Sequence, residues 1–292
     1  MEQLHNDHFL VVIDRHGAQI NHIYNRKYHF DYIWNNDIWP KHAPVLFPAI
    51  GRSNEDAYLY EGRRYNMPQH GFASDYDFDI IESNDTKLVL SLKANEATKK
   101  IYPFDFVLTV TFTLGDDGLT LRFVVANRGE KTLSYSLGSH PAFNVPIDGE
   151  GAFDDYTLRF TPQQRELKQF GIVKTPNPYR DGKIKDVVGF DGELPLDYRH
   201  FDDGLIIIEN EGIAEVELSS PKTSHSIALT LSDFRYLTLW TKEGSDAPFL
   251  CLEPFNGLPD VVGEPLDIMK KEGNMLLEPG ELKASSYSIR LS

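Results

Sequence analysis

The chain has 292 residues, of which 41% are hydrophobic, so it can bury a sizeable core as one large domain or as two smaller ones. Its formal net charge of −15 opposes binding to nucleic acid or to anionic lipid, because both require clustered Lys and Arg. No apolar run approaches the ~20 residues that span a bilayer, and the N-terminus lacks the basic and apolar regions of a secretion signal. We therefore expect a cytosolic protein that binds a neutral or cationic small molecule.

Most of the predicted elements are strands, because apolar and polar residues alternate with period two along much of the chain. The segment "FDFVLTVTFTL" (104–114) places its apolar residues on one face and mainly Thr on the other. The turn residues "GDDG" follow, and "LTLRFVVANR" (119–128) alternates again, which predicts an antiparallel hairpin. Similar strand patterns occur, in chain order, at residues 9–14, 87–94, 205–210, 214–220, 226–232, 236–241, 249–255 and 286–292.

Helical periodicity is nearly absent. The segment "TPQQRELKQF" (161–170) could form one short helix with Thr161 as the N-cap and Pro162 in the first turn. Residues 174–203 are rich in Pro, Gly and Asp and predict a long loop. Many strands without βαβ alternation indicate an all-β fold, a large antiparallel β-sandwich, and we expect residues 1–292 to form one such domain.

Two polar residues precede prolines in segments that otherwise read as strands. His140 lies in "SHPAFN" and Glu253 in "CLEPFNGLPD". Proline disfavours helical backbone in the residue before it, so we expect both residues to be extended, where a strand meets a loop. An imidazole and a carboxylate can move protons near neutral pH if both reach one substrate. Each could instead be an ordinary strand-end residue with a satisfied side chain.

Other residues in Gly- and Pro-framed segments are candidates for ligand binding. Arg52 in "FPAIGRSN" could clamp sugar hydroxyls or a carboxylate, or pair with a nearby acid. His70 in "QHGFAS" could donate to a ligand or cap a turn. Trp34, Trp39 and Trp240 could stack on a sugar ring or pack in the core.

The sequence predicts no metal site and no cofactor. HxH, HExxH and CxxC spacings do not occur, and neither do the glycine-rich nucleotide-binding motifs or the G-x-S-x-G nucleophile motif. Cys251 is the only cysteine, so it cannot form an intramolecular disulfide. We expect a buried structural thiol, with a catalytic thiol as the alternative.

Four segments in this order resemble the aldose 1-epimerase (galactose mutarotase-like) superfamily, in particular its LacX-like branch. They are "APVLFPAIGRSN", "MPQHGFASDYDF", "GSHPAFNVP" and "CLEPFNGLPD". The stretches "HGAQINHIYN" and "DYIWNNDIWP" also fit that branch, so the resemblance extends over essentially the whole chain. It implies a β-supersandwich and an isomerase of carbohydrate metabolism that interconverts the α and β anomers of an aldose without metal or cofactor.

The resemblance also implies a role for each residue that matches the family's motifs. Glu253 matches the general base that takes the anomeric hydroxyl proton, and His140 matches the acid that protonates the ring oxygen. His70 and Arg52 match substrate-binding positions. An acidic residue that holds sugar hydroxyls maps to Asp203, with Asp202 as the alternative, and Asn144 of the His140 segment is expected to have a local structural role.

Three functions follow as alternatives. The first is an aldose 1-epimerase that acts on a free hexose such as galactose. The second is a hexose-6-phosphate 1-epimerase, which would need several basic residues at the pocket, with Arg63 and Arg64 the nearest candidates. The third is a non-catalytic carbohydrate-binding or sugar-sensing protein. The segment reads "GRSNED" where galactose-acting members commonly have Asn-Arg after the glycine, so the resemblance does not specify the sugar, and it leaves the oligomeric state open.

Overall fold

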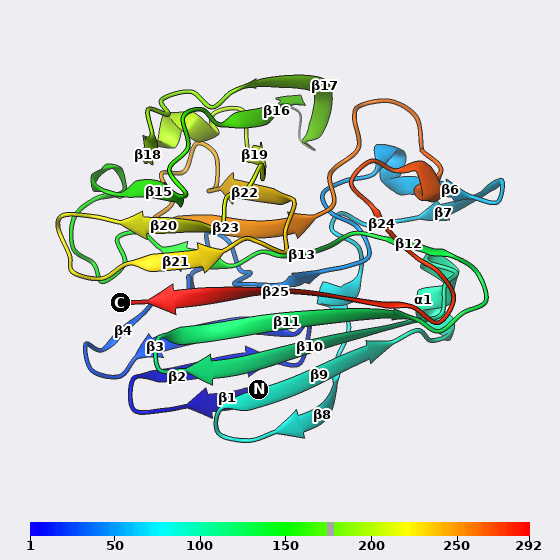
Figure 1. Cartoon of the computed structure of the whole chain (residues 1–292), viewed down its shortest axis with the longest axis horizontal. Coiled ribbons are helices and arrows are strands. Elements are labelled where there is room, and N and C mark those ends of the chain that lie inside the picture. The colour runs from blue at the N-terminus through cyan, green and yellow to red at the C-terminus, as the bar shows by residue number, and fades with distance from the viewer. Residues whose placement is uncertain (174–177) are drawn as a thin grey trace.

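The computed structural model describes residues 1–173 and 178–292, and almost all of its regular elements are strands (Figure 1). Two large antiparallel sheets dominate. In spatial order, the nine-stranded sheet contains β18 (Glu193–Pro195), β15 (Thr157–Thr161), β20 (Glu215–Ser219), β21 (Ile227–Thr230), β25 (Leu282–Leu291), β11 (Gly118–Asn127), β10 (Phe106–Gly115), β9 (Lys87–Lys93) and β8 (Asp79–Ser83). These findings confirm the all-β, antiparallel architecture.

The eight-stranded sheet carries most of the residues discussed below. It runs in the order β17 (Tyr179–Asp186), β16 (Lys168–Val173), β19 (Ile206–Glu209), β22 (Tyr236–Trp240), β23 (Phe249–Asn256), β13 (Leu137–Ser139) and β5 (Val45–Leu46), and β14 (Ala142–Asn144) also pairs with β23. In Figure 1, β22 and β23 lie above the long strands β25, β11, β10 and β9.

Smaller elements complete the fold. A four-stranded sheet contains β1 (Glu2–His5), β2 (Phe9–Asp14), β3 (Gln19–Asn25) and β4 (Phe30–Asp31), and two strand pairs join β6 (Ala57–Tyr60) with β7 (Arg63–Asn66) and β12 (Leu133–Tyr135) with β24 (Met275–Leu277). The helices are α1 (Glu96–Ile101) and the 3₁₀ turns η1 (Asn54–Asp56), η2 (Ala73–Asp75), η3 (Phe153–Asp155), η4 (Tyr198–Phe201) and η5 (Ile268–Lys270). Among the described helices, none is long and apolar enough to cross a membrane.

The predicted hairpin is confirmed as β10 and β11. Gly115 pairs with Gly118 across the two-residue turn, and the even-numbered residues of β10 are buried in the core. Gly118 has φ +139°, and a Cβ added there would lie 2.0 Å from the carbonyl oxygen of Ile289 on β25. The turn therefore requires glycine for its backbone conformation and for its contact with the next strand.

Two local predictions were wrong. No helix forms over residues 161–170, because Thr161 pairs with Glu215 at the end of β15 and Lys168 pairs with Asp186 at the start of β16. Sheet pairing thus overrides a weak local preference for helix. The expected long loop contains β17, β18 and η4 within residues 178–203, whereas its residues 174–177 lie outside the described part of the chain.

The sequence analysis did not predict helix α1. Asn95 accepts hydrogen bonds from the backbone N–H groups of Ala97 and Thr98, and the Thr98 hydroxyl in turn accepts from the Asn95 N–H. This reciprocal capping stabilises a helix of only six residues, too short to show clear periodicity. The sequence feature that indicates this helix is therefore the three-residue spacing of Asn95 and Thr98.

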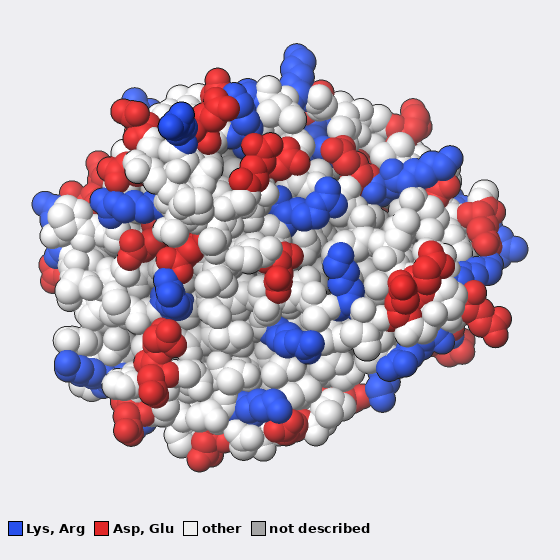
Figure 2. Space-filling model, viewed as in Figure 1, with Lys and Arg blue, Asp and Glu red and all other residues white. Residues whose placement is uncertain are grey.

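Acidic and basic side chains are intermingled on the face shown in Figure 2. Exposed ion pairs of the described residues include Arg159 with Glu193 and Lys131 with Glu61. Such pairs contribute little to stability because both partners remain hydrated.

We expect Gly118→Ala to lower the free energy of unfolding by about 3 kcal/mol, because the new methyl group meets the Ile289 carbonyl in addition to the backbone strain. Gly62→Ala is the matched control, since Gly62 also has positive φ but nothing lies within 4 Å of its added Cβ. The control should lose only about 1 kcal/mol in urea unfolding. Equal losses in the two variants would contradict the steric explanation.

Candidate active site

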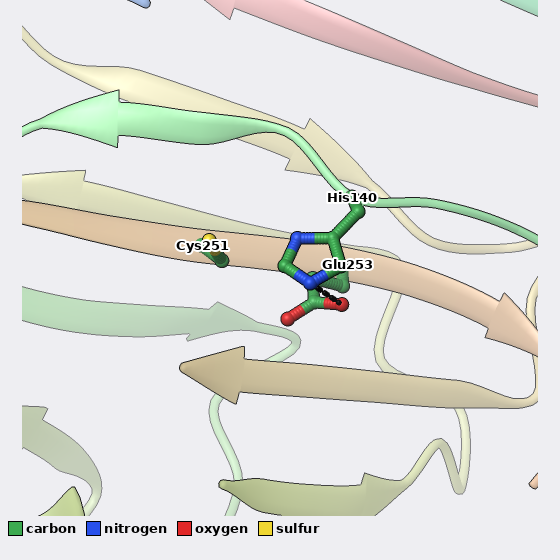
Figure 3. Close-up of side chains that lie close together, drawn as sticks. All are labelled: His140, Cys251 and Glu253. Carbon is green, nitrogen blue, oxygen red and sulfur yellow. Dashed lines mark ion pairs between the residues drawn. The ribbon is translucent and has the colours of Figure 1, made fainter. Parts of the chain in front are cut away.

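The pairing of two short strands with β23 brings His140 and Glu253 together. Gly138 on β13 pairs with Phe255, and Ala142 on β14 pairs with Cys251, so His140 lies between these two pairs and opposite Glu253. His140 Nε2 lies 3.2 Å from Glu253 Oε2, and both side chains are almost fully buried. Figure 3 shows the imidazole projecting from the connection after β13 over the carboxylate on β23. His140 is at a strand end as expected, whereas Glu253 is inside its strand.

Alternation along β23 gives its two faces different surroundings. Leu250 and Leu252 pack in the main hydrophobic core. Phe249 and Cys251 belong to a separate apolar cluster on the other face, which Glu253 shares. Glu253 therefore shares a face with Cys251 and Phe249, as period-two alternation along "FLCLEPF" requires, and the partner of this buried carboxyl group is His140.

A cavity of about 300 Å³ opens over this pair. Its volume is at the lower end of the range for small-molecule sites. The side chains that line it include aromatic, charged and amide groups: Trp39, Lys41, Gln69, His70, His140, Trp240, Glu243, Glu253 and Phe255. A small molecule with both polar groups and an apolar face fits such a lining.

Two tryptophans form walls next to His140. The Trp39 ring stacks on the imidazole with centroids 4.9 Å apart, and Trp240 presents an edge at 5.8 Å. Trp34 is buried against Phe249, and its indole N–H donates to the Trp39 carbonyl. Two of the three tryptophans proposed from the sequence therefore line the cavity, and Trp34 supports one of them from the core.

His70 lines the cavity in a defined tautomeric state. The Gly51 N–H donates to His70 Nδ1 at 3.1 Å, so in the neutral ring the proton is on Nε2. Burial lowers the pKa of His70 to about 3, helped by the charges of Lys41 and Arg52. His70 is thus a neutral hydrogen-bond donor at the cavity wall.

Arg52 lies at the edge of this cavity. Its guanidinium donates to Gln69 Oε1 at 3.5 Å and to Asp56 Oδ2 at 3.3 Å, and its Nε is buried without a partner. Gln69 itself lines the cavity.

Asp203 is not brought to this cavity. Asp202 and Asp203 are exposed and line a separate pocket, where Asp203 Oδ2 lies 3.5 Å from Lys185 Nζ. Arg63 and Arg64 lie on β7 outside the cavity lining, and Arg64 pairs with Glu55. The Asn144 amide donates to the carbonyls of Asp31 and Ile33, which is the expected local structural role.

Burial opposes charge on both members of the His140–Glu253 pair. It lowers the pKa of His140 well below its ordinary value, with a further contribution from His70, and it raises the pKa of Glu253 well above its ordinary value. The family resemblance implies that Glu253 is the base, which requires a carboxylate. Neutral imidazole with carboxylic acid and imidazolium with carboxylate contain the same number of protons, so the two states differ only in the position of one proton across the 3.2 Å contact.

Three buried side-chain atoms in the described part of the chain have no hydrogen-bond partner: Arg52 Nε, His140 Nδ1 and Thr238 Oγ1. Thr238 on β22 pairs with Glu253 on β23, so its side chain is on the same face as the carboxylate. Unpaired buried polar groups are costly and rare. Thr238 was not among the site residues predicted from the sequence. It shares a strand face with Trp240 in "YLTLWT", but the β22–β23 register is needed to place that face beside Glu253.

The carboxylate, the imidazole and the Cys251 thiol lie within 4.8 Å of one another (Figure 3). Burial and the nearby Glu253 raise the pKa of Cys251 well above its ordinary value. A neutral thiol is a poor metal ligand and a poor nucleophile. This geometry agrees better with the structural thiol than with a catalytic one.

Comparison with known proteins identifies the family. The family model for aldose 1-epimerase matches residues 2–290. The chain belongs to the aldose 1-epimerase family. It is 29% identical to the chromosomal protein LacX of Lactococcus lactis subsp. lactis, over 99% of this chain and 98% of that protein.

Solved structures of similar proteins have the same fold. A galactose mutarotase-like protein from Lactobacillus casei ATCC 334 superposes with a TM-score of 0.95 at 41% identity, and the match covers 100% of both chains. A galactose mutarotase related enzyme from Lactobacillus acidophilus has a TM-score of 0.93 at 28% identity, over 99% of this chain and 96% of that one. The galactose mutarotase-like fold is therefore shown for this chain.

Replacing the unpaired hydroxyl should stabilise the protein. We expect Thr238→Val to raise the free energy of unfolding by about 1 kcal/mol, because it removes a buried polar group that has no partner. Thr241→Val is the matched control, since the buried Thr241 hydroxyl donates to the Ala247 carbonyl at 3.3 Å. That variant should lose about 1 kcal/mol in urea unfolding. A loss of stability in Thr238→Val would contradict the orphaned state of the hydroxyl.

Acid should destabilise the fold through His70. Burial lowers the pKa of His70 to about 3 in the folded protein, so at this residue the unfolded state binds more protons as the pH falls below 6.5. The lowered pKa of His140 acts in the same direction, but the raised pKa of its partner Glu253 acts in the opposite direction, so the contributions of this pair offset each other. Urea unfolding between about pH 7 and about pH 5 should therefore show a loss of stability that comes from His70. His70→Gln should flatten this decline, whereas His8→Gln, at an exposed position, should leave it unchanged. An identical slope in His70→Gln and the parent protein would contradict the neutral state of His70.

Proposed function

We propose that this protein is an aldose 1-epimerase that interconverts the α and β anomers of a free hexose by acid/base ring opening and closure. The observation that carries the proposal is the 3.2 Å contact between a buried imidazole and a buried carboxylate at the floor of a cavity of about 300 Å³. A pyranose opens when its anomeric hydroxyl loses a proton while its ring oxygen gains one. One base and one acid within reach of these two oxygens are sufficient.

In the proposed cycle, the His140–Glu253 pair takes one proton from the sugar and gives one proton to it. In the imidazolium–carboxylate state, Glu253 takes the anomeric hydroxyl proton and His140 gives its proton to the ring oxygen as the C1–O5 bond breaks. The pair is then a neutral imidazole and a carboxylic acid, which is the state that burial favours. Rotation about C1–C2 and ring closure reverse both transfers, so the other anomer forms and the pair returns to its first state.

The surrounding residues have binding roles in this proposal. His70 donates from Nε2 to a sugar oxygen, and Arg52 donates to hydroxyls next to Gln69. Trp39 and Trp240 contact the apolar face of the ring, as aromatic side chains do in sites for molecules that are polar on one side only. Asp203 has no role here because it lies in a separate pocket.

The charges at the cavity favour a free sugar over a phosphorylated one. Lys41 is the one Lys or Arg among the described residues of the lining, and Glu243 lines the same cavity. Arg52, at the cavity edge, already pairs with Asp56. A phosphate group usually requires several converging cations. The buried acid/base pair favours catalysis over sugar binding alone, because neutral donors and acceptors would suffice to hold a ligand.

The test is polarimetry of freshly dissolved α-galactose and α-glucose with metal-chelated protein. We expect faster equilibration, and we expect Glu253→Gln to lose about 10³-fold in kcat because an amide cannot accept the hydroxyl proton. His140→Asn should lower kcat more than it weakens sugar binding. Glu193→Gln, an exposed substitution on β18, is the control.

The possible outcomes discriminate between the three functions. Full activity in Glu253→Gln would refute the base assignment. If the parent protein accelerates neither free sugar, the same assay on glucose 6-phosphate tests the phosphorylated class. Binding of sugar without acceleration of any substrate would support the sugar-binding alternative.

A further inference from the structure

Asp260, the last residue of the "CLEPFNGLPD" segment, forms a buried ion pair that lies outside the cavity lining. Its Oδ1 contacts Lys271 Nζ, and both side chains are more than nine-tenths buried. Its Oδ2 accepts a hydrogen bond from the Asn54 N–H at 2.9 Å. Both carboxylate oxygens are therefore occupied, one by a charge and one by the backbone of the "GRSN" segment.

The same residue holds the backbone on both sides of the Arg52 side chain. The Asp260 N–H donates to the Arg52 carbonyl at 3.0 Å, while its carboxylate accepts from Asn54 two residues further on. The Asp260 carbonyl accepts from the Arg180 N–H of β17 at 3.0 Å. Asp260 thus joins three segments that are far apart in the sequence.

Pro259, the residue before Asp260, packs on Gly51, and Gly51 in turn contacts His70. Pro259 packs so closely on Gly51 that a Cβ at Gly51 would lie 2.4 Å from the proline Cγ, and the Arg180 guanidinium Nε donates to the Pro259 carbonyl at 2.8 Å. The Gly51 N–H is the group that donates to His70 Nδ1. The position of residues 259–260 therefore determines where Gly51 lies and which nitrogen of His70 carries the proton.

We propose that the Asp260–Lys271 ion pair positions Arg52 and His70 for sugar binding. The inference rests on the proposed function, since it assigns these two residues to the substrate. A buried ion pair adds little net stability compared with apolar residues of the same volume. Its directional contacts instead determine how the Arg52 and Pro259 segments meet, so Asp260 and Lys271 are positioning residues that do not contact the sugar.

The kinetic test compares Asp260→Asn with the parent protein. An Asn carbonyl can still accept from Asn54, but it no longer pairs with the Lys271 ammonium, so we expect KM for the hexose to rise about 10-fold. kcat should stay within about 2-fold, because the pairing of β13 and β14 with β23 holds His140 and Glu253 independently. Lys131→Met, which breaks the exposed pair with Glu61, is the control and should change neither parameter.

A second variant and a second readout keep the test decisive. Asp260→Asn/Lys271→Met removes both charges, so it leaves no uncompensated ammonium in the interior and serves if the single variant does not fold. Imidazole ¹⁵N spectra report the tautomer of His70 without any turnover. We expect the Nε2–H tautomer in the parent protein and a mixture of tautomers in the variants.

The two proposals fail in different ways. A parent protein that accelerates no anomer exchange would refute the proposed function, and the His70 spectrum would then decide the positioning role alone. An unchanged KM together with an unchanged His70 spectrum would overturn the positioning role, even if the melting temperature fell. A fall in kcat at constant KM would also overturn it, because the pair would then act on the chemical step.

Discussion

The site depends on one constraint: two short strands, β13 and β14, pair with different parts of β23. β13 pairs with β23 near its end and β14 pairs nearer its start, and the break between them leaves His140 opposite Glu253. A buried carboxyl group without a hydrogen-bond partner is costly, and this pairing register supplies the imidazole as that partner. The remaining features of the cavity are arranged around this contact.

The site combines favourable packing with unsatisfied polar groups. Trp39 and Trp240 pack against the imidazole, and burial moves the pKa values of His140 and Glu253 in the directions that disfavour charge. The buried side-chain atoms without partners in residues 1–173 and 178–292 belong to Arg52, His140 and Thr238. Unsatisfied groups of this kind are expected where a protein gives up stability to keep a site ready for a ligand.

The loops at the cavity are held by polar contacts, whereas the strands are held by apolar ones. β10 and β11 bury alternating apolar side chains in the main core. Residues 52–54 carry no apolar side chain, and their backbone is held by two hydrogen bonds with Asp260. A family of enzymes can therefore keep one sandwich and vary the substrate through the loops at its edge.

Local patterns in the sequence determined the class of the fold and the residues that could move protons. Period-two alternation indicated the strands and the β10–β11 hairpin, because the side chains of a half-buried strand must alternate between core and solvent. The prolines after His140 and Glu253 marked two extended positions, and parity along β23 placed Glu253 beside Cys251. These inferences depend only on residues that are close together in the sequence.

Only the tertiary structure decided which of these residues meet. Alternation gives the face of a side chain but not the partner of its strand, so neither the His140–Glu253 contact nor the orphaned Thr238 could be derived from local spacing. The separation of Asp203 from the cavity and the clamp of Asp260 on the Arg52 segment also depend on contacts between distant segments. Such contacts are set by the packing of whole sheets, which no single segment of the sequence encodes.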